Sequence, residues 1–341
     1  MAELSLRASS YPAGANWTAW RSAGVQRVQV SVDASVEVTE AIRSAGLHVT
    51  GRLPAFRSER ARTQTIVSAL DEVDARWLYP SEDAIEPLQR GRFDEIELSA
   101  LRFGSQLEEQ LGSRLGEAVV CELDAWAASV DVSERGRAAV ASAGADPERV
   151  ALSLRRYLSG RIDGSVPAEL RACAAAVELL LAEDTAPVLR ARVEAVAAAG
   201  AGIAGALRLI DPGLGVSVEL DGSRLERGSI ALALRDAVDS LALRSDGSLL
   251  SLRRDLEAHS ALAGPSAACV LPVPSAGIRD SERLADALDI VEGLGVERVV
   301  LATNEAWVSI GMDAVTRAAS RLRGRPAERA GQARRWELEV L

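Results

Sequence analysis

The chain of 341 residues contains no lysine. Apart from histidine, its basic side chains are therefore 39 arginines. Without a lysine amine there can be no Schiff-base aldolase, and a P-loop nucleotide site would lack its phosphate-binding lysine. Only two histidines are present, His48 and His259, so a three-histidine zinc site cannot be built. Several common enzyme chemistries are therefore excluded.

Cysteine, aromatic residues and clustered positive charge are also scarce. The three cysteines, Cys121, Cys173 and Cys269, stand far apart, which is typical of buried free thiols in a reducing compartment. Aromatic residues make up 4% of the chain, and the net charge is -10. No basic tract suits nucleic acid or an anionic membrane, and no apolar run reaches transmembrane length. We expect a cytoplasmic protein with neither of these partners and with no metal or other cofactor.

Short β-branched runs alternate with alanine-rich amphipathic stretches, which is the pattern of a parallel sheet covered by helices. Glycines at 24, 46 and 295 end helices and lead directly into strands. Because this arrangement recurs at both ends of the chain, we predict one closed (β/α)₈ TIM barrel spanning residues 1–341. The eight predicted strands are residues 3–8, 27–33, 47–53, 95–100, 216–221, 239–244, 268–273 and 298–304.

About 110 residues separate the fourth and fifth predicted strands. We expect this segment, residues 105–212, to be an all-helical insertion within the barrel, with helices at 106–115, 133–144, 147–159 and 168–199. A separate helical domain is the alternative. No linker rich in proline, glycine and serine isolates the segment, which favours the insertion.

The alternation of side chains along each strand predicts which residues enter the barrel. Apolar residues should face the helices, as the valines at 28, 30 and 32 do, so that Asp33 points inward. The same rule sends charged residues inward from five further strands. Grouped at the carboxyl-terminal mouth, these side chains can pair and be hydrated, whereas scattered burial would be prohibitive. The six are Arg7, Asp33, Arg52, Glu97, Glu219 and Arg244.

Residues 77–84 (WLYPSEDA), 93–104 (FDEIELSALRFG) and 20–28 (WRSAGVQRV) resemble a bacterial family of glycoside-hydrolase-like TIM-barrel proteins, mostly of undetermined activity. Members carry Asp-Gly-Ile-Glu-Leu on the fourth strand, so the resemblance implies that Glu97 is the family's strand-four glutamate. It extends over about the first 160 residues. The members' cysteine pair after that strand is reduced here to Cys121, which makes the chain a divergent member without a thiol pair for a metal.

Glu97 is the first catalytic candidate, because an inward, buried carboxyl group can have its pKa raised and serve as a general acid. Glu219 is its candidate partner, with Asp221 as the alternative, since glycoside hydrolysis needs two carboxyl groups. The simpler alternative is that both glutamates pair with arginines in a structural network. Asn304 and Trp307 are further binding candidates at the eighth strand, and Trp307 can offer a flat apolar face to a sugar. We expect His48 inside the barrel and His259 on the surface.

Three functions stay open. The first is a barrel that binds a ligand or a protein partner with reduced or lost catalysis. The second is an active carbohydrate hydrolase that uses Glu97 and Glu219. The third is an isomerase or lyase acting on a small anionic substrate held near Arg7, Arg52 and Arg244.

Overall fold

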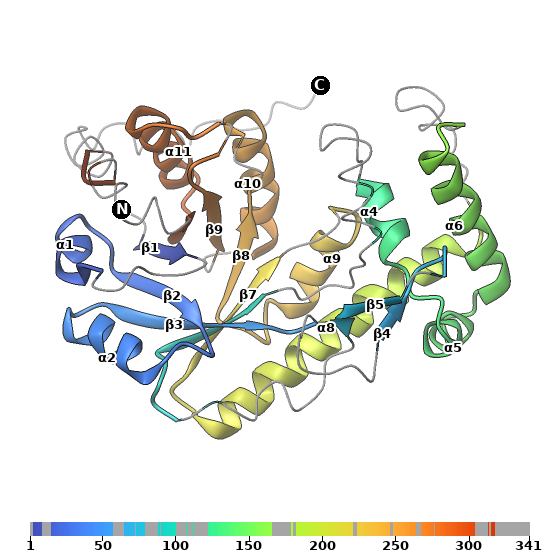
Figure 1. Cartoon of the computed structure of the whole chain (residues 1–341), viewed down its shortest axis with the longest axis horizontal. Helices are drawn as coiled ribbons and strands as arrows, with labels where there is room; N and C mark the ends of the chain where they lie inside the picture. Colours follow the sequence, from blue (N-terminus) through green and yellow to red (C-terminus); the bar gives the residue numbers. More distant parts are fainter. Residues whose placement is uncertain are drawn as a thin grey trace.

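The computed structural model describes residues 3–8, 15–56, 65–71, 73–78, 88, 90–99, 107, 111, 122–165, 179, 182–220, 224–245, 248–263, 267–275, 277–303, 313 and 315–317. Eight parallel strands close into a barrel in the order β1-β10-β9-β8-β7-β6-β3-β2 (Figure 1). They are β1 (Glu3–Ala8), β2 (Arg27–Ser31), β3 (His48–Pro54), β6 (Glu95–Ser99), β7 (Gly215–Leu220), β8 (Ser240–Arg244), β9 (Ala267–Pro272) and β10 (Arg298–Thr303).

The predicted (β/α)₈ barrel is confirmed, and each predicted strand agrees with the observed one to within two residues at either end. The first and last strands pair along their whole length, from Glu3 beside Arg298 to Ala8 beside Thr303. Gly24 and Gly295 have φ values of 105° and 71°. Only glycine adopts this conformation at little cost, and it lets the chain leave a helix and enter a strand within two residues.

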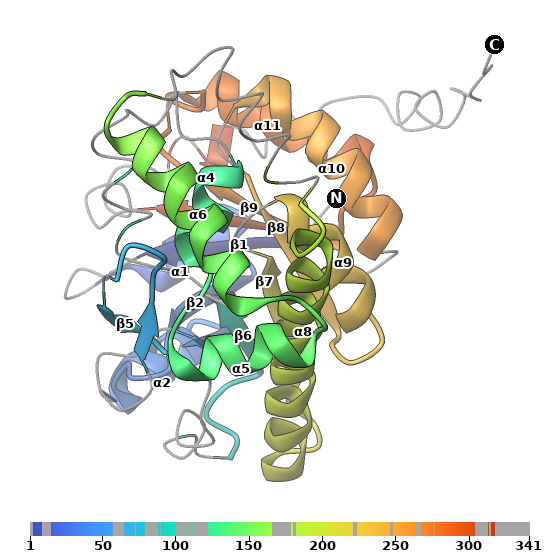
Figure 2. The same cartoon turned by 90° about the vertical axis from the view of Figure 1, so that its right-hand side faces the viewer.

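Helices surround the barrel and cover its outer face (Figures 1 and 2). Their contact with the strands is mainly aliphatic, with a few aromatic residues such as Trp20 of α1 among the buried side chains. Fully buried residues such as Val28, Val49, Leu98 and Val218 point from the strands into this layer. The helices are α1 (Trp17–Ser22), α2 (Val36–Ser44), α8 (Thr185–Ile210), α9 (Arg224–Leu234), α10 (Leu249–Ala263) and α11 (Ser281–Gly293).

A second hydrophobic cluster lies beside the barrel and has its own buried residues, among them Trp126, Leu154 and Leu158. It is built from α4 (Glu122–Ser129), α5 (Glu134–Ser142), α6 (Pro147–Ile162) and the amino-terminal end of α8. An antiparallel hairpin of β4 (Thr65–Val67) and β5 (Val73–Leu78) lies in the chain before this region. Val67 of β4 and Ala69 and Leu70 of the turn also join the cluster. Two separate connections of the barrel, β3 to β6 and β6 to β7, therefore supply this cluster.

The sequence predicted part of this region. The helices expected at 133–144 and 147–159 are confirmed as α5 and α6. Ser133 and Asp146 cap them, each accepting hydrogen bonds from backbone N–H groups in the first turn. The hairpin and α4 were not predicted, and α8 begins at Thr185 and runs to Ile210 instead of ending at 199. The bounds 105–212 of the insertion stay a prediction, because much of 100–121 and 166–181 lies outside the described residues.

α8 joins the two clusters. It is long and apolar enough to cross a membrane by length and composition alone. Val188 near its start packs into the second cluster, whereas Val196, Ile203 and Leu207 pack into the barrel core. A helix that contacts two cores along its length needs this apolar composition.

Two glycines of the second cluster and α8 test the packing. A Cβ at Gly136 would lie 2.1 Å from the backbone oxygen of Asp131, whereas a Cβ at Gly202 has no heavy atom within 4 Å. We expect Gly136→Ala to lower the free energy of unfolding by about 1–3 kcal/mol. The matched control Gly202→Ala should raise it by up to about 1 kcal/mol, because alanine favours helix over glycine. Denaturant unfolding measures both, and equal effects would contradict the described packing.

Candidate functional site

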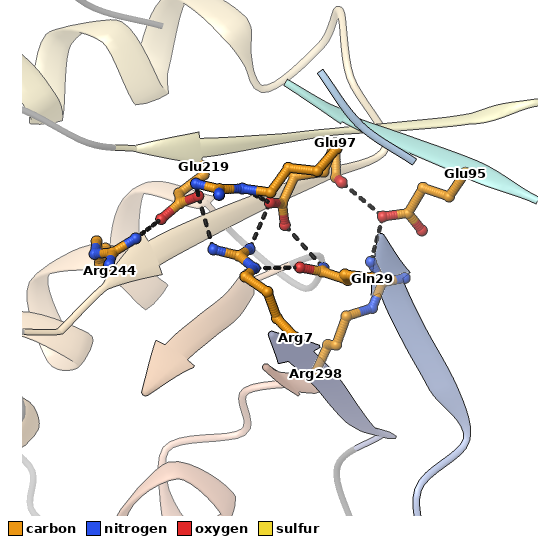
Figure 3. A network of polar contacts seen from close by, with 9 residues as sticks. Arg7, Gln29, Glu95, Glu97, Glu219, Arg244 and Arg298 are labelled. Carbon is orange, nitrogen blue, oxygen red and sulfur yellow. Dashed lines mark hydrogen bonds and ion pairs between the residues drawn. The ribbon is translucent and has the colours of Figure 1, made fainter. Parts of the chain in front are cut away.

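The barrel interior contains two layers of charged side chains, and Figure 3 shows members of both. The lower layer comes from the first residues of four strands, and the upper layer from residues farther along the strands, from the middle of β2 and β6 to the last residue of β8. Side chains two residues apart on a strand point to the same side, so both layers arise from one inward-facing set. Barrel enzymes assemble their sites at the carboxyl-terminal end, which directs attention to the upper layer.

The lower layer is a closed ring of alternating charge formed by Glu3, Arg27, Glu95 and Arg298. Arg27 donates from Nε to Glu3 Oε1 at 2.7 Å, and its Nη1 lies 3.3 Å from Glu95 Oε2. Arg298 donates from Nη1 to Glu95 Oε1 at 2.5 Å, and its Nε lies 3.5 Å from Glu3 Oε2. Ser217 donates a further bond of 2.6 Å to Glu95 Oε1. Two arginines balance two glutamates, so this ring is neutral and closes the amino-terminal end of the barrel.

The upper layer is organised around Arg7, which is 5% exposed. Its Nη2 donates to Glu97 Oε1 at 2.5 Å, and its Nη1 donates to Glu219 Oε2 at 2.9 Å. Its Nε donates to Gln29 Oε1 at 2.6 Å, and Gln29 Nε2 donates to Glu97 Oε2 at 3.0 Å. One guanidinium therefore bridges the two catalytic candidates, which lie on the same side of the barrel wall.

Glu219 is also the anchor of two arginines nearer the mouth. Arg52 donates from Nη2 to Glu219 Oε2 at 3.0 Å, and Arg244 donates from Nη1 to Glu219 Oε1 at 2.9 Å. Figure 3 shows Arg244 on the side of Glu219 away from Arg7. The side chains of Arg52 and Arg244 are 36% and 42% exposed, whereas those of Glu97 and Glu219 are 1% exposed. The glutamates are buried and the two outer arginines reach solvent.

The environment moves the pKa values of the two glutamates in opposite directions. Burial raises the pKa of Glu97, and the nearby charge of Glu219 adds to this, against the opposing effect of Arg7. Burial also acts to raise the pKa of Glu219, but Arg7, Arg52 and Arg244 outweigh it and lower that pKa to about 2. Because the groups are coupled, a proton taken up by the pair goes first to Glu97.

The opposite wall of the barrel interior is apolar and made of small residues. Ala242, Ala268, Val270 and Val300 form a buried cluster on β8, β9 and β10, with Ala302 packed against it. Short side chains on these three strands leave space for the long side chains that enter from β1, β3, β6 and β7. Along these three strands the middle of the interior is therefore apolar, whereas Arg298 of β10 and Arg244 of β8 add charge at its two ends.

The structure brings five of the sequence candidates into this network: Arg7, Arg52, Glu97, Glu219 and Arg244. Asp33 lies in the turn after β2, where it is exposed and its backbone N–H donates to Ser31 Oγ. Asp221, Asn304 and Trp307 lie outside the described residues. Within the described part of the chain, no group of three histidine, cysteine, aspartate or glutamate residues is placed to hold a metal ion.

Both expectations for the histidines were wrong. His48 is the first residue of β3, and its side chain is 65% exposed at the amino-terminal rim instead of enclosed in the barrel. His259 on α10 is 4% exposed, and its Nε2 lies 2.9 Å from the carbonyl oxygen of Leu241 on β8. Alternation gives the direction of a side chain but not its depth along the barrel, which explains the error at His48. Burial of His259 follows from its place on the strand-facing side of α10.

Sequence reasoning missed most of the lower ring. Glu95 shares the inward side of its strand with the predicted Glu97, but Glu3, Arg27 and Arg298 were not recognised. The available signal was the same alternation followed back to the first residue of each strand, where two acids and two arginines occur. Gln29 lies on the same side of β2 by this alternation, and it connects Arg7 to Glu97.

An open pocket of about 610 Å³ lies at the amino-terminal end of the barrel, away from the upper layer. It is lined in part by Glu3, Arg27, His48 and the glycines at 24 and 46. Conserved chemistry in barrel enzymes is found at the other end. We therefore place the candidate site at the carboxyl-terminal mouth, although the pocket is larger than the other described cavities.

Comparison with known proteins gives a likeness of fold. No family model and no curated protein matches the chain. Eleven chains of solved structures match it, among them the beta-galactosidase from the psychrophilic Marinomonas ef1. That match has a TM-score of 0.54 at 11% identity and covers 94% of this chain and 59% of the other. The fold is glycoside-hydrolase-like. At this identity the likeness concerns the fold alone, and the chain spans about three fifths of the length of that structure.

Breaking the lower ring should cost much more stability than breaking an exposed pair. We expect Glu95→Ala to lower the free energy of unfolding by about 3–5 kcal/mol, because Arg27 and Arg298 in the barrel interior each lose one of their two carboxylate partners. Glu148→Ala is the matched control, since it removes an exposed ion pair with Arg137 and should cost about 1 kcal/mol or less. Chemical denaturation of both variants checks this. Similar losses would show that the ring contributes little to closing the barrel.

The lowered pKa of Glu219 predicts how its contribution to stability depends on pH. A carboxyl group whose pKa falls from 4.5 to about 2 on folding stabilises the folded state above pH 4.5, and this stabilisation is lost as the pH falls through 2. The difference in free energy of unfolding between wild type and Glu219→Gln should thus be largest at neutral pH and shrink on acidification. Urea titrations at several pH values measure it, and a pH-independent difference would contradict the assignment.

Proposed function

We propose that this glycoside-hydrolase-like barrel binds a small ligand at its carboxyl-terminal mouth and does not hydrolyse glycosidic bonds. One observation carries the proposal. All four carboxyl oxygens of Glu97 and Glu219 accept a hydrogen bond from an arginine or from Gln29. The carboxyl oxygens of the candidate catalytic pair are therefore already hydrogen-bonded to other side chains.

Glycoside hydrolysis places specific demands on two carboxyl groups. One must donate a proton to the departing oxygen, and the other must attack the sugar or activate a water molecule. Both must reach the substrate, yet each side chain is 1% exposed. Freeing either glutamate would take one charged acceptor away from the buried Arg7, which is costly. The network thus favours a structural use of both acids over a catalytic one.

The alternative is an active carbohydrate hydrolase, and one observation favours it. The pKa of Glu97 is raised while that of Glu219 is lowered to about 2, and such a separation is how two carboxyl groups take the roles of acid and base. A ligand that displaced Gln29 from Glu97 would expose a proton donor beside an ionised partner. This reading requires the network to rearrange when a sugar binds.

The family assignment is part of the proposal. The likeness to a beta-galactosidase supports a place for this chain among divergent bacterial members of the glycoside-hydrolase-like barrel proteins. The reduction of their cysteine pair to Cys121 is in keeping with loss of an ancestral site. We further propose a cytoplasmic protein that acts on carbohydrate or another small molecule, without nucleic-acid or membrane partners. An isomerase or lyase acting on a small anion is the third candidate, supported by the three arginines of the upper layer.

Hydrolysis assays test the proposal. We expect the purified protein to release no detectable product from nitrophenyl glycosides, galactosides included, across pH 4 to about 8, the range over which paired carboxyl groups work as acid and base. Glu97→Gln and Glu219→Gln should not change this result. Turnover by the wild type that is abolished in a folded Glu97→Gln variant would overturn the proposal in favour of the hydrolase.

A further inference from the structure

Counted over the described residues, the upper layer has an excess of positive charge that faces solvent. Three arginines (Arg7, Arg52 and Arg244) pair there with two glutamates (Glu97 and Glu219), so one positive charge is in excess when both acids are ionised. Protonation of Glu97, whose pKa burial raises, would increase the excess. The lower ring has no such imbalance, since its two arginines meet two glutamates.

The excess is located on the two outer arginines. Arg7 is buried, and its Nε, Nη1 and Nη2 all donate to protein acceptors. Arg52 and Arg244, in contrast, each donate a single hydrogen bond within the described part of the chain, and both go to Glu219. A guanidinium has five N–H donors, so most donors on these two side chains have no acceptor among the described residues. The Nε of Arg52 is buried and has no hydrogen-bond partner among the described residues, although Glu97 Oε1 lies 3.7 Å away.

Glu219 fixes the geometry of the two arginines. Its Oε2 holds Arg52 and its Oε1 holds Arg244, so the two guanidiniums attach to different oxygens of one buried carboxylate. An arginine fixed in this way loses less conformational entropy on binding than a free one. Two fixed guanidiniums at a mouth can meet the planar or tetrahedral oxygen arrangement of a carboxylate or a phosphate, with two parallel bonds from each.

We propose that Arg52 and Arg244 form a receptor for an oxyanion, so that the ligand of the mouth is a small molecule carrying a carboxylate or a phosphate. The inference rests on the proposed function in that it names the ligand class of the same mouth. Glu219 acts as the positioning residue, and Arg7 holds Glu219 from below. A neutral sugar would leave these donors with water alone and gain little from the site.

Calorimetric titration of the intact protein at low salt tests this inference. Glucuronate and glucose are matched probes, because they share a ring and differ in a carboxylate against a hydroxymethyl group. Inorganic phosphate is the third probe, and it tells whether the site prefers a phosphate or a carboxylate. We expect at least one of the two anions to bind and glucose to bind at least about tenfold more weakly.

Variants locate the site. Arg52→Gln and Arg244→Gln should each weaken anion binding about tenfold or more, and Arg244→Lys should restore only part of it, because an ammonium keeps the charge without the paired donors. Arg43→Gln is the control, since Arg43 is also 36% exposed and paired with one acid, Asp94, but lies at the amino-terminal side. It should leave binding unchanged. Thermal melting checks that every variant is folded.

The inference fails if neither anion binds, if glucose binds as well as glucuronate, or if Arg52→Gln and Arg244→Gln bind as the wild type does. Loss of binding in Arg43→Gln would also overturn it, since the site would then lie elsewhere. These outcomes are distinct from the hydrolysis assay. Turnover of a glycoside would show that the proposed function is wrong on catalysis. The titration would still decide whether the mouth binds anions.

Discussion

Arg7 is the residue on which the interior of this barrel depends. A guanidinium in a protein interior must meet acceptors on all sides, and here two glutamates and a glutamine from three other strands provide them. Each acid in turn is acceptable at 1% exposure only because an arginine faces it. The strands β1, β2, β6 and β7 are thereby joined through their side chains as well as through the walls of the barrel, and loss of either acid takes a charged acceptor from the buried Arg7.

Both charged layers consist of arginine and glutamate side chains, but they differ in net charge. This difference is why we assign the lower ring a structural role and propose a functional role for the upper layer. The two arginines and two glutamates of the lower ring satisfy one another. Among the described residues, the upper layer has one arginine more than it has glutamates, and its two outer arginines are 36% and 42% exposed. The small residues of β8, β9 and β10 give both layers their space. A barrel interior that is apolar throughout would be simpler to fold, so the polar half calls for a reason beyond stability.

The amino-acid sequence predicted the barrel because the signals for its strands and helices lie within short segments of the chain. β-branched runs, helix-ending glycines and alternation are set within about ten residues, and all eight strands followed from them. Alternation also placed Arg7, Glu97 and Glu219 inside. Alternation does not give the position of a side chain along the barrel axis, nor the residues with which it pairs. His48 has the predicted inward register but lies at the rim, and the bridge from Arg7 to two acids 90 and 212 residues away depends on how the ring closes.

A likeness in fold to a beta-galactosidase does not carry its chemistry, because chemistry depends on which groups are free to react. In a glycosidase, two carboxyl groups are the reactive elements and their surroundings keep them accessible. Here two carboxyl groups on neighbouring strands are enclosed by arginines, and the accessible groups are the arginines themselves. On the proposed function, the mouth presents hydrogen-bond donors to the solvent where a hydrolase presents acids. Such an arrangement would suit the retention of anions and not the cleavage of neutral sugars.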